Sequence, residues 1–186
     1  MILVALAAAT GVAVAIAWLY NGLVAARQRV REGWSAIDVQ LQRRSSLIPN
    51  LVEVVKGYAA FERETLTRVV EARRALGDAA GPAAAAHANA DLTGALHTVF
   101  ALAEAYPDLK ASERFAALQK DLADTENTIA YARNYYNGAV EAYNIRAETV
   151  PGALVARAFG FRLAEFFSAD GADRVVPPVP PLHIVR

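Results

Sequence analysis

The chain has 186 residues, with 19 Lys or Arg against 19 Asp or Glu and no cysteine, so its formal net charge is zero. Without a basic field or a basic face carrying stacking aromatics, nucleic acid is not an expected partner. The lack of cysteine excludes a disulfide scaffold, a thiolate metal site and a cysteine nucleophile. Alanine occurs 41 times, and because it is the best helix former this composition favours an all-α fold.

Residues 1–20 predict a transmembrane helix. They contain no charged side chain and are mostly Leu, Ile, Val and Ala, which is enough apolar helix to cross about 30 Å of hydrocarbon. Trp18 and Tyr20 then lie where interfacial aromatic residues belong. A cleaved signal peptide is the alternative, but no basic region precedes the apolar stretch. We therefore expect an uncleaved anchor that places the chain in the lipid bilayer.

Basic residues near the span predict its orientation. No Lys or Arg precedes it, whereas Arg27, Arg29 and Arg31 follow within the range where the positive-inside bias acts. This asymmetry predicts a single-pass protein with its N-terminus outside and its body in the cytoplasm. Arg27 is the first of these residues and is expected at the membrane interface.

Residues 21–150 are predicted to form an antiparallel four-helix bundle. Apolar residues recur there at spacings of three and four, which places each set on one helix face. Short connections favour an up-down-up-down order, with the first helix continuous with the membrane span. Proline and glycine breaks, including Pro49 as a helix start, predict helices over residues 21–45, 49–76, 82–106 and 112–149.

Tyrosine–asparagine pairs gather at the predicted membrane-proximal end of the bundle. They are Tyr20-Asn21, Tyr136-Asn137 and Tyr143-Asn144. A ring next to an amide supplies both packing and hydrogen bonds, so Asn21, Asn137, Tyr143 and Asn144 are candidates to lock two helices in register. Alternatively, the tyrosines pack in the core and the asparagines face solvent.

Residues 151–168 are predicted to form an amphipathic segment. In the predicted up-down order the preceding helix returns to the membrane, so this segment should lie next to the bilayer. Its phenylalanines are Phe159, Phe161, Phe166 and Phe167, interleaved with arginines. We favour a position in the membrane interface, where the arginines face lipid phosphate, over closure of the bundle end. Residues 169–186 are predicted to be a flexible proline-rich tail.

The end of the bundle far from the membrane is a candidate partner surface. The predicted turns at 45–49 and 106–112 meet there and carry charged and polar side chains beside exposed apolar ones. A simple closure of the bundle end by salt bridges is equally compatible with this composition. The candidate contact residues are Arg43, Arg44, Asn50, Tyr106 and Asp108.

No catalytic, cofactor or metal pattern is found in the sequence. The three histidines lack metal-ligand spacing, and phosphate-binding loops, nucleophile elbows and dinucleotide fingerprints do not occur. Paired Glu-x-x-His motifs of a bundle-core di-iron site are also missing. We therefore expect a protein that is not an enzyme.

Ordered motifs run through residues 18–168, among them YNGLV at 20–24, WSAIDVQL at 34–41, LIPNLV at 47–52, LAEAYPDLK at 102–110 and AEFF at 164–167. In these stretches the chain resembles the LemA family of bacterial membrane proteins. The resemblance implies an N-terminal anchor in the bacterial cytoplasmic membrane and an antiparallel bundle, but no enzymatic reaction. It also implies partners, because relatives are associated with an HtpX-type membrane zinc metalloprotease and with membrane-organelle formation in magnetotactic bacteria.

These observations predict a structural or adaptor protein that self-associates in the membrane and presents its bundle to a partner. The alternative is a sensory bundle on the outer side of the cytoplasmic membrane that holds a small molecule between helices. The two differ in the compartment of the C-terminus.

Overall fold

The computed structural model describes residues 1–57 and 63–169, and these residues form six helices and no strand. In chain order they are α1 (Ile2–Lys56), α2 (Arg63–Asp78), α3 (Pro82–Ala103), α4 (Pro107–Lys110), α5 (Glu113–Glu148) and α6 (Gly152–Ala158). The all-α prediction is confirmed. The predicted tail at 169–186 lies outside the described residues, except for Ala169.

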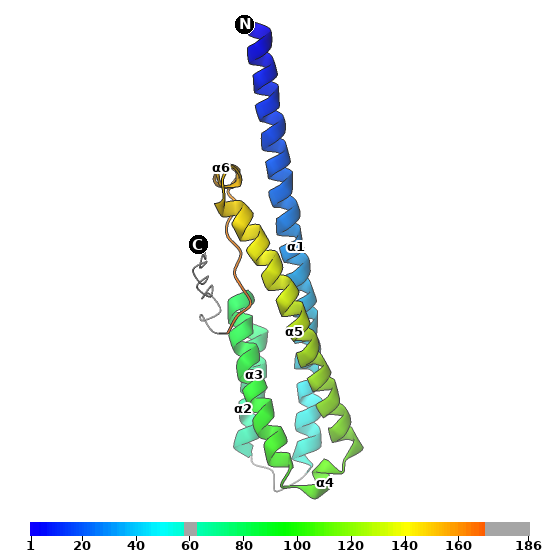
Figure 1. The fold of residues 1–186 in the computed structure, drawn as a ribbon. Helices are drawn as coiled ribbons and strands as arrows, with labels where there is room; N and C mark the ends of the chain where they lie inside the picture. Colours follow the sequence, from blue (N-terminus) through cyan, green and yellow to red (C-terminus); the bar gives the residue numbers. More distant parts are fainter. Residues whose placement is uncertain (58–62, 170–186) are drawn as a thin grey trace, which may run out of the picture.

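Helix α1 has 55 residues, about 83 Å at 1.5 Å per residue. Its first part extends beyond the rest of the molecule (Figure 1), and an 18-residue window of mean hydropathy 2.4 has none of its residues buried. This part is long and apolar enough to cross a membrane. The chain thus carries a candidate membrane-spanning helix that continues without a break into the bundle.

The predicted helix break at residues 45–49 is wrong, because α1 runs through Pro49 to Lys56. Proline has no N–H, so the carbonyl of Ser45, four residues earlier, loses its helical donor. Arg73 of α2 replaces that donor: its Nε donates to the Ser45 oxygen at 3.0 Å. The second helix consequently begins at Arg63 rather than at residue 49, and residues 58–62 of its predicted range lie outside the described residues.

Two long helices, α1 and α5, pack side by side and form the backbone of the molecule (Figure 1). They approach closely at Gly33, where an added Cβ would lie 3.1 Å from the Tyr136 Cα. Helix α5 begins as predicted next to Ser112, whose Oγ accepts a hydrogen bond from the Phe115 N–H. At 36 residues it is about 54 Å long.

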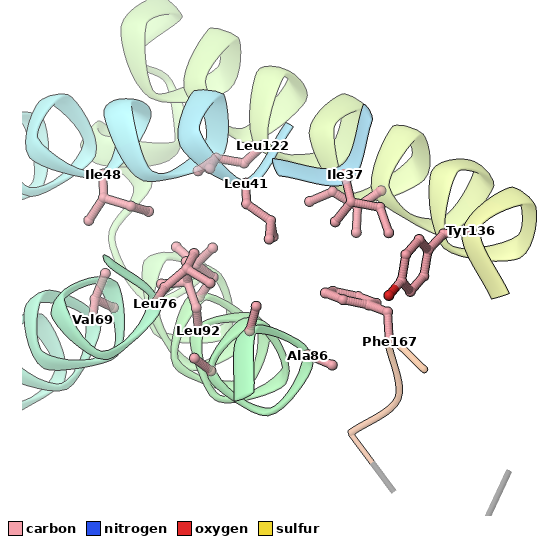
Figure 2. Close-up of a cluster of buried hydrophobic side chains, with 14 of the residues drawn as sticks. Ile37, Leu41, Ile48, Val69, Leu76, Ala86, Leu92, Leu122, Tyr136 and Phe167 are labelled. Carbon is pink, nitrogen blue, oxygen red and sulfur yellow. The ribbon is translucent and has the colours of Figure 1, made fainter. Parts of the chain in front are cut away.

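The shorter α2–α3 hairpin covers one face of this pair, at the end far from the N-terminus (Figure 1). Figure 2 shows the resulting core, in which Ile37 and Leu41 of α1 point into the same core as Leu76 of α2 and Leu92 of α3. All four side chains are buried. The hairpin spans only part of the length of α1 and α5, so the face nearer the membrane span needs another cover.

That cover is an extended segment, residues 161–169, that follows α6. The chain leaves α5, makes the short helix α6, turns at Gly160 (φ 71°) and runs back alongside α5 towards the top of α3 (Figure 1). A left-handed φ of this kind favours glycine. Phe167 on this segment is 3% exposed and faces Tyr136 (Figure 2).

Candidate functional site

Four side chains of α5 hold the extended segment by its backbone; we call Tyr136, Asn137, Tyr143 and Asn144 the Tyr–Asn ladder. The Asn144 amide pairs with both polar groups of Ala164, donating to its oxygen at 3.0 Å and accepting from its N–H at 2.9 Å. Asn137 does the same with Phe167, at 3.2 and 3.0 Å. An asparagine amide has the donor and acceptor of a peptide group, so each one acts like a neighbouring strand.

The tyrosine hydroxyls add one bond in each repeat of the ladder. Tyr143 donates to the Arg162 oxygen and Tyr136 to the Glu165 oxygen, each at 2.7 Å. The two repeats of the ladder are therefore separated by seven residues on α5 and by three residues on the extended segment. Seven residues of helix rise about 10.5 Å and three of extended chain about 10 Å, so the two spacings match.

The ladder joins a helix to an extended segment, whereas the sequence predicted that it would join two helices. Tyr136 and Tyr143 are each 2% exposed. Burial, and secondarily the nearby Glu165 carboxylate, raises the pKa of Tyr136 to about 12. Burial also raises the pKa of Tyr143, against a smaller lowering effect of Arg27. Both hydroxyls therefore stay protonated donors at neutral pH.

The predicted interface phenylalanines separate into two groups. Phe167 is buried and lies against Trp34, with ring centroids 6.3 Å apart, so its assignment to the membrane interface is wrong. Phe166 is half-buried beside it. Phe159 and Phe161 instead pack edge-on against Tyr20 of α1, at 5.0 and 5.6 Å. The alternative prediction, closure of the bundle end, thus describes the part of the segment that carries Phe166 and Phe167.

Other predicted residues of the membrane-proximal end lie on α1. Trp18 is 76% exposed and Arg27 is exposed. Asn21 lines a hollow beside the α5–α6 corner. Trp18, Tyr20 and Arg27 therefore lie along the part of α1 where the exposed apolar stretch meets the bundle.

A buried charged cluster occupies the middle of the bundle. Arg44 of α1 is 2% exposed and donates to the Asn89 Oδ1 of α3 at 2.6 Å. The same guanidinium nitrogen forms a salt bridge with Glu126 of α5, whose side chain is 42% exposed. Burial lowers the pKa of Arg44, and the Glu126 carboxylate opposes that shift. One side chain thereby links three helices.

The prediction that Arg44 belongs to a partner surface is wrong, because its side chain is buried. Its neighbour Arg43 is exposed. Because α1 continues to Lys56, both lie about 18 Å from its end, not at the tip of the bundle. Asn89 and Glu126 were not predicted as its partners, although an arginine on an apolar helix face signals that a buried acceptor must exist.

The remaining candidates do lie near the tip. Asn50 lines a groove of about 670 Å³ between the end of α1 and the start of α5, together with Glu53, Val54, Ser112, Arg114, Ala117 and Leu118. Tyr106 precedes α4 and is half-buried, and Asp108 is exposed in its first turn. Lys110 of α4 pairs with Glu104 at 2.5 Å. This end combines polar contacts with an open, partly apolar groove.

Two further observations on the described residues concern metal and ligand binding. Within 1–57 and 63–169, no three His, Cys, Asp or Glu side chains gather closely enough to hold a metal ion. A second groove, of about 340 Å³, runs between α3 and α5 over Arg44, Thr93, His97, Phe100 and Glu126, among others. Its polar groups are in part already engaged with one another, as in the bond between Thr93 and Glu126 at 3.4 Å.

Comparison with known proteins identifies several relatives. Two magnetosome proteins MamQ of Paramagnetospirillum magneticum are each 26% identical to the chain over 82% of its length and 66% of theirs. The protein LemA of Metamycoplasma hominis is 26% identical over 83% of the chain and 71% of its own length. The chain spans slightly less than two thirds of the length of the magnetosome relatives.

The sequence profile of the LemA family matches residues 33–180. This range includes residues 33–56 of α1, the buried Arg44 cluster, the Tyr–Asn ladder and the extended segment that the ladder holds. The match covers well over half of the chain. The chain therefore belongs to the LemA family.

Proposed function

We propose that the chain is a membrane-anchored structural or adaptor protein that performs no chemical reaction. The observation that carries this proposal is the direct continuation of the exposed apolar part of α1 into a bundle in which Arg44 bonds to Asn89 and Asn144 bonds to the extended segment. A continuous helix anchored in the bilayer would hold the far end of the bundle at a fixed distance from the membrane. In the proposed topology, the N-terminus is outside and the bundle is in the cytoplasm.

The groove at Asn50 is the proposed partner surface. It lies at the end farthest from the span and combines Glu53 and Arg114, of opposite charge, with Val54 and Leu118. Such a mixture suits a protein partner. An HtpX-type membrane metalloprotease is the proposed partner, because it would be held in the same membrane.

Self-association is the second part of the proposal. Tyr131 and Tyr135 lie one turn apart on α5 and are 78% and 55% exposed. Exposed tyrosines are favourable contact residues between protein copies. They are on the helix that also carries the ladder, so a lateral contact there would join the stiffest parts of two copies.

Site-specific crosslinking tests the partner surface. A photo-crosslinking amino acid in place of Asn50 should join the full chain to the co-expressed metalloprotease in intact membranes. The matched control is the same substitution at Asn134, an exposed asparagine of α5. Equal yields from both positions would refute the assignment of the groove. Mass measurement in mild detergent tests self-association, and a strictly monomeric particle with no retained protein would refute the adaptor proposal.

A sensory bundle outside the cytoplasmic membrane is the alternative, favoured by the groove of about 340 Å³ over Arg44 and His97. Its size suits a small molecule more than a protein partner. A compartment-specific reporter fused to the C-terminus separates the two proposals. Activity outside the membrane would support the sensory bundle and overturn the cytoplasmic topology.

A further inference from the structure

A hollow of about 500 Å³ lies where the candidate membrane span meets the corner between α5 and α6. Residues of α1 form one wall, and the end of α5 with the chain leading into α6 forms the other. The lining residues are Trp18, Leu19, Asn21, Gly22, Leu23, Arg146, Thr149, Val150, Pro151 and Gly152.

One guanidinium lies against the wall of this largely apolar hollow. Arg146 Nη1 donates to the Gly22 backbone oxygen at 3.3 Å, and a Cβ added at Gly22 would be in ordinary contact with that nitrogen, at 3.7 Å. Arginine carries five N–H donors in a fixed fork, so one bond to a carbonyl leaves others for an anion. The hollow therefore offers apolar walls and a cation in one place.

The exposed apolar surface of the span continues onto this corner. Trp18 is 76% exposed, and Val150, Leu154 and Phe159 on the other side are 79%, 65% and 57% exposed. Isolated exposed apolar residues are common, but a set that adjoins a bare apolar helix is typical of a surface that meets lipid. The mouth of the hollow is thus at the level of the bilayer interface when the span is in the membrane.

Charge is distributed unevenly along the neutral chain. Residues 21–31 of α1 and 143–163 at the end of α5 and beyond it contain six arginines and one glutamate, a net charge of +5, with Glu32, Glu141 and Glu165 just outside these ranges. The remaining 13 basic and 18 acidic residues give the rest of the chain −5. Basic clusters next to a membrane span attract anionic lipid headgroups. The local charge therefore favours a negatively charged ligand at the hollow.

We infer that this hollow binds a phospholipid with an anionic headgroup. Arg146 contacts the lipid phosphate, and an acyl chain lies between Trp18 and Leu19 of α1 and Val150 of the corner. The bound lipid would fill the gap between the two helices just where they separate. This inference rests on the proposed membrane anchoring and adds a lipid class and a positioned headgroup to it.

Native mass spectrometry of the full chain in mild detergent tests the inference, with phosphatidylglycerol and phosphatidylcholine of identical acyl chains as probes. We expect phosphatidylglycerol to be retained in preference. Arg146→Gln should weaken its binding about tenfold. Arg133→Gln removes the same charge from an exposed position of α5 outside the hollow and should leave binding unchanged. Equal binding by the two variants, or no preference between the lipids, would overturn the inference.

A second pair of variants guards against misfolding of the Arg146 variant. Val150 is 79% exposed, so its replacement should leave the packing intact. Val150→Glu places a carboxylate at the mouth and should lower phosphatidylglycerol binding, whereas the uncharged Val150→Gln should not; similar binding by both would count against a phosphate at this place. Carbonate extraction separates the two proposals. If the chain stays in the membrane but shows no lipid preference, the lipid-binding inference alone is overturned. If carbonate releases the chain, the proposed membrane anchoring is overturned as well.

Discussion

The same pair of helices, α1 and α5, is covered in two different ways along its length. At the distal end, the α2–α3 hairpin buries apolar side chains, and a charged cluster of Arg44, Asn89 and Glu126 links the layers. Nearer the span, the extended segment is held by neutral amides and hydroxyls that bond its backbone. The α2–α3 hairpin is thus held through its side chains, whereas the extended segment is held by hydrogen bonds to its main chain.

This difference determines how each half should respond to mutation. Apart from the buried Phe167, backbone recognition depends little on the sequence of the bound segment and strongly on the spacing of the ladder. The charged cluster depends on a single guanidinium whose partners come from two other helices. Loss of ladder residues should therefore free one segment, whereas loss of a cluster residue should weaken the contact between whole layers.

The largest expected effect is that of removing both ladder asparagines. Asn137→Leu with Asn144→Leu leaves the N–H and C=O groups of Ala164 and Phe167 without partners, and Phe167 is buried. We expect the free energy of unfolding to fall by about 3–5 kcal/mol. Denaturant unfolding of the full chain in detergent, followed by circular dichroism, measures this change.

The exposed Asn134 of α5 provides the matched control. Asn134→Leu should change the free energy of unfolding by less than about 0.5 kcal/mol. Limited proteolysis should cut the double variant within 161–168 before the bundle is cut. If the double variant were as stable and as resistant as the control, the ladder would not hold the segment in solution.

A pH dependence distinguishes the ladder from the charged cluster. The folded state raises the pKa of Tyr136 from 10.0 to about 12, so it binds that proton more tightly than the unfolded chain. The corresponding stability is fully present below pH 10 and is lost as the pH rises towards about 12. A shift of this size corresponds to about 2–3 kcal/mol. Unfolding measured across this range should show the loss.

Tyr136→Phe should remove much of this alkaline loss, because the variant has no hydroxyl to ionise. It should also lower stability at neutral pH by about 1 kcal/mol, since the Glu165 oxygen loses its donor. Part of the slope should remain, because the pKa of Tyr143 is raised as well. An unchanged slope in the variant would show that Tyr136 does not cause it.

The charged cluster should respond to loss of its anion. Glu126→Gln keeps an acceptor near Arg44 but removes the negative charge, and partial exposure of Glu126 lets water replace some of it. We expect a cost of about 2 kcal/mol, below that of breaking a fully buried pair. Combining it with Arg44→Met should cost less than the sum of the two single changes. Strictly additive costs would show that the two residues do not interact.

Part of this architecture was predictable from sequence. Spacings of three and four gave the helical faces, and Ser112 and Pro82 marked the starts of α5 and α3. The partners of the Tyr–Asn pairs were not predictable, because an extended segment without a second strand has no periodic signal of its own. Phe167 lies between half-buried residues in such a segment, and its fixed register places it in the core.

The error at Pro49 has a physical cause that the sequence near it does not contain. A proline within a helix leaves one carbonyl without a donor, and whether the helix continues depends on a replacement. Here the replacement comes from Arg73, 28 residues away from the Ser45 carbonyl that it binds. The local signal of Pro49 therefore predicted a break that a contact between helices removes.

A double-mutant cycle on this contact should give the smallest effect. Arg73→Met removes the donor to the Ser45 oxygen and should cost about 1 kcal/mol. In a Pro49→Ala background, the new N–H at position 49 can donate to the same oxygen, so the cost of Arg73→Met should shrink. Arg74→Met is the control, because Arg74 is exposed and its ion pair with Asp78 is long, at 3.9 Å. An equal cost of Arg73→Met in both backgrounds would mean that the arginine does not substitute for the missing helical donor, and the continuity of α1 would then depend on packing alone.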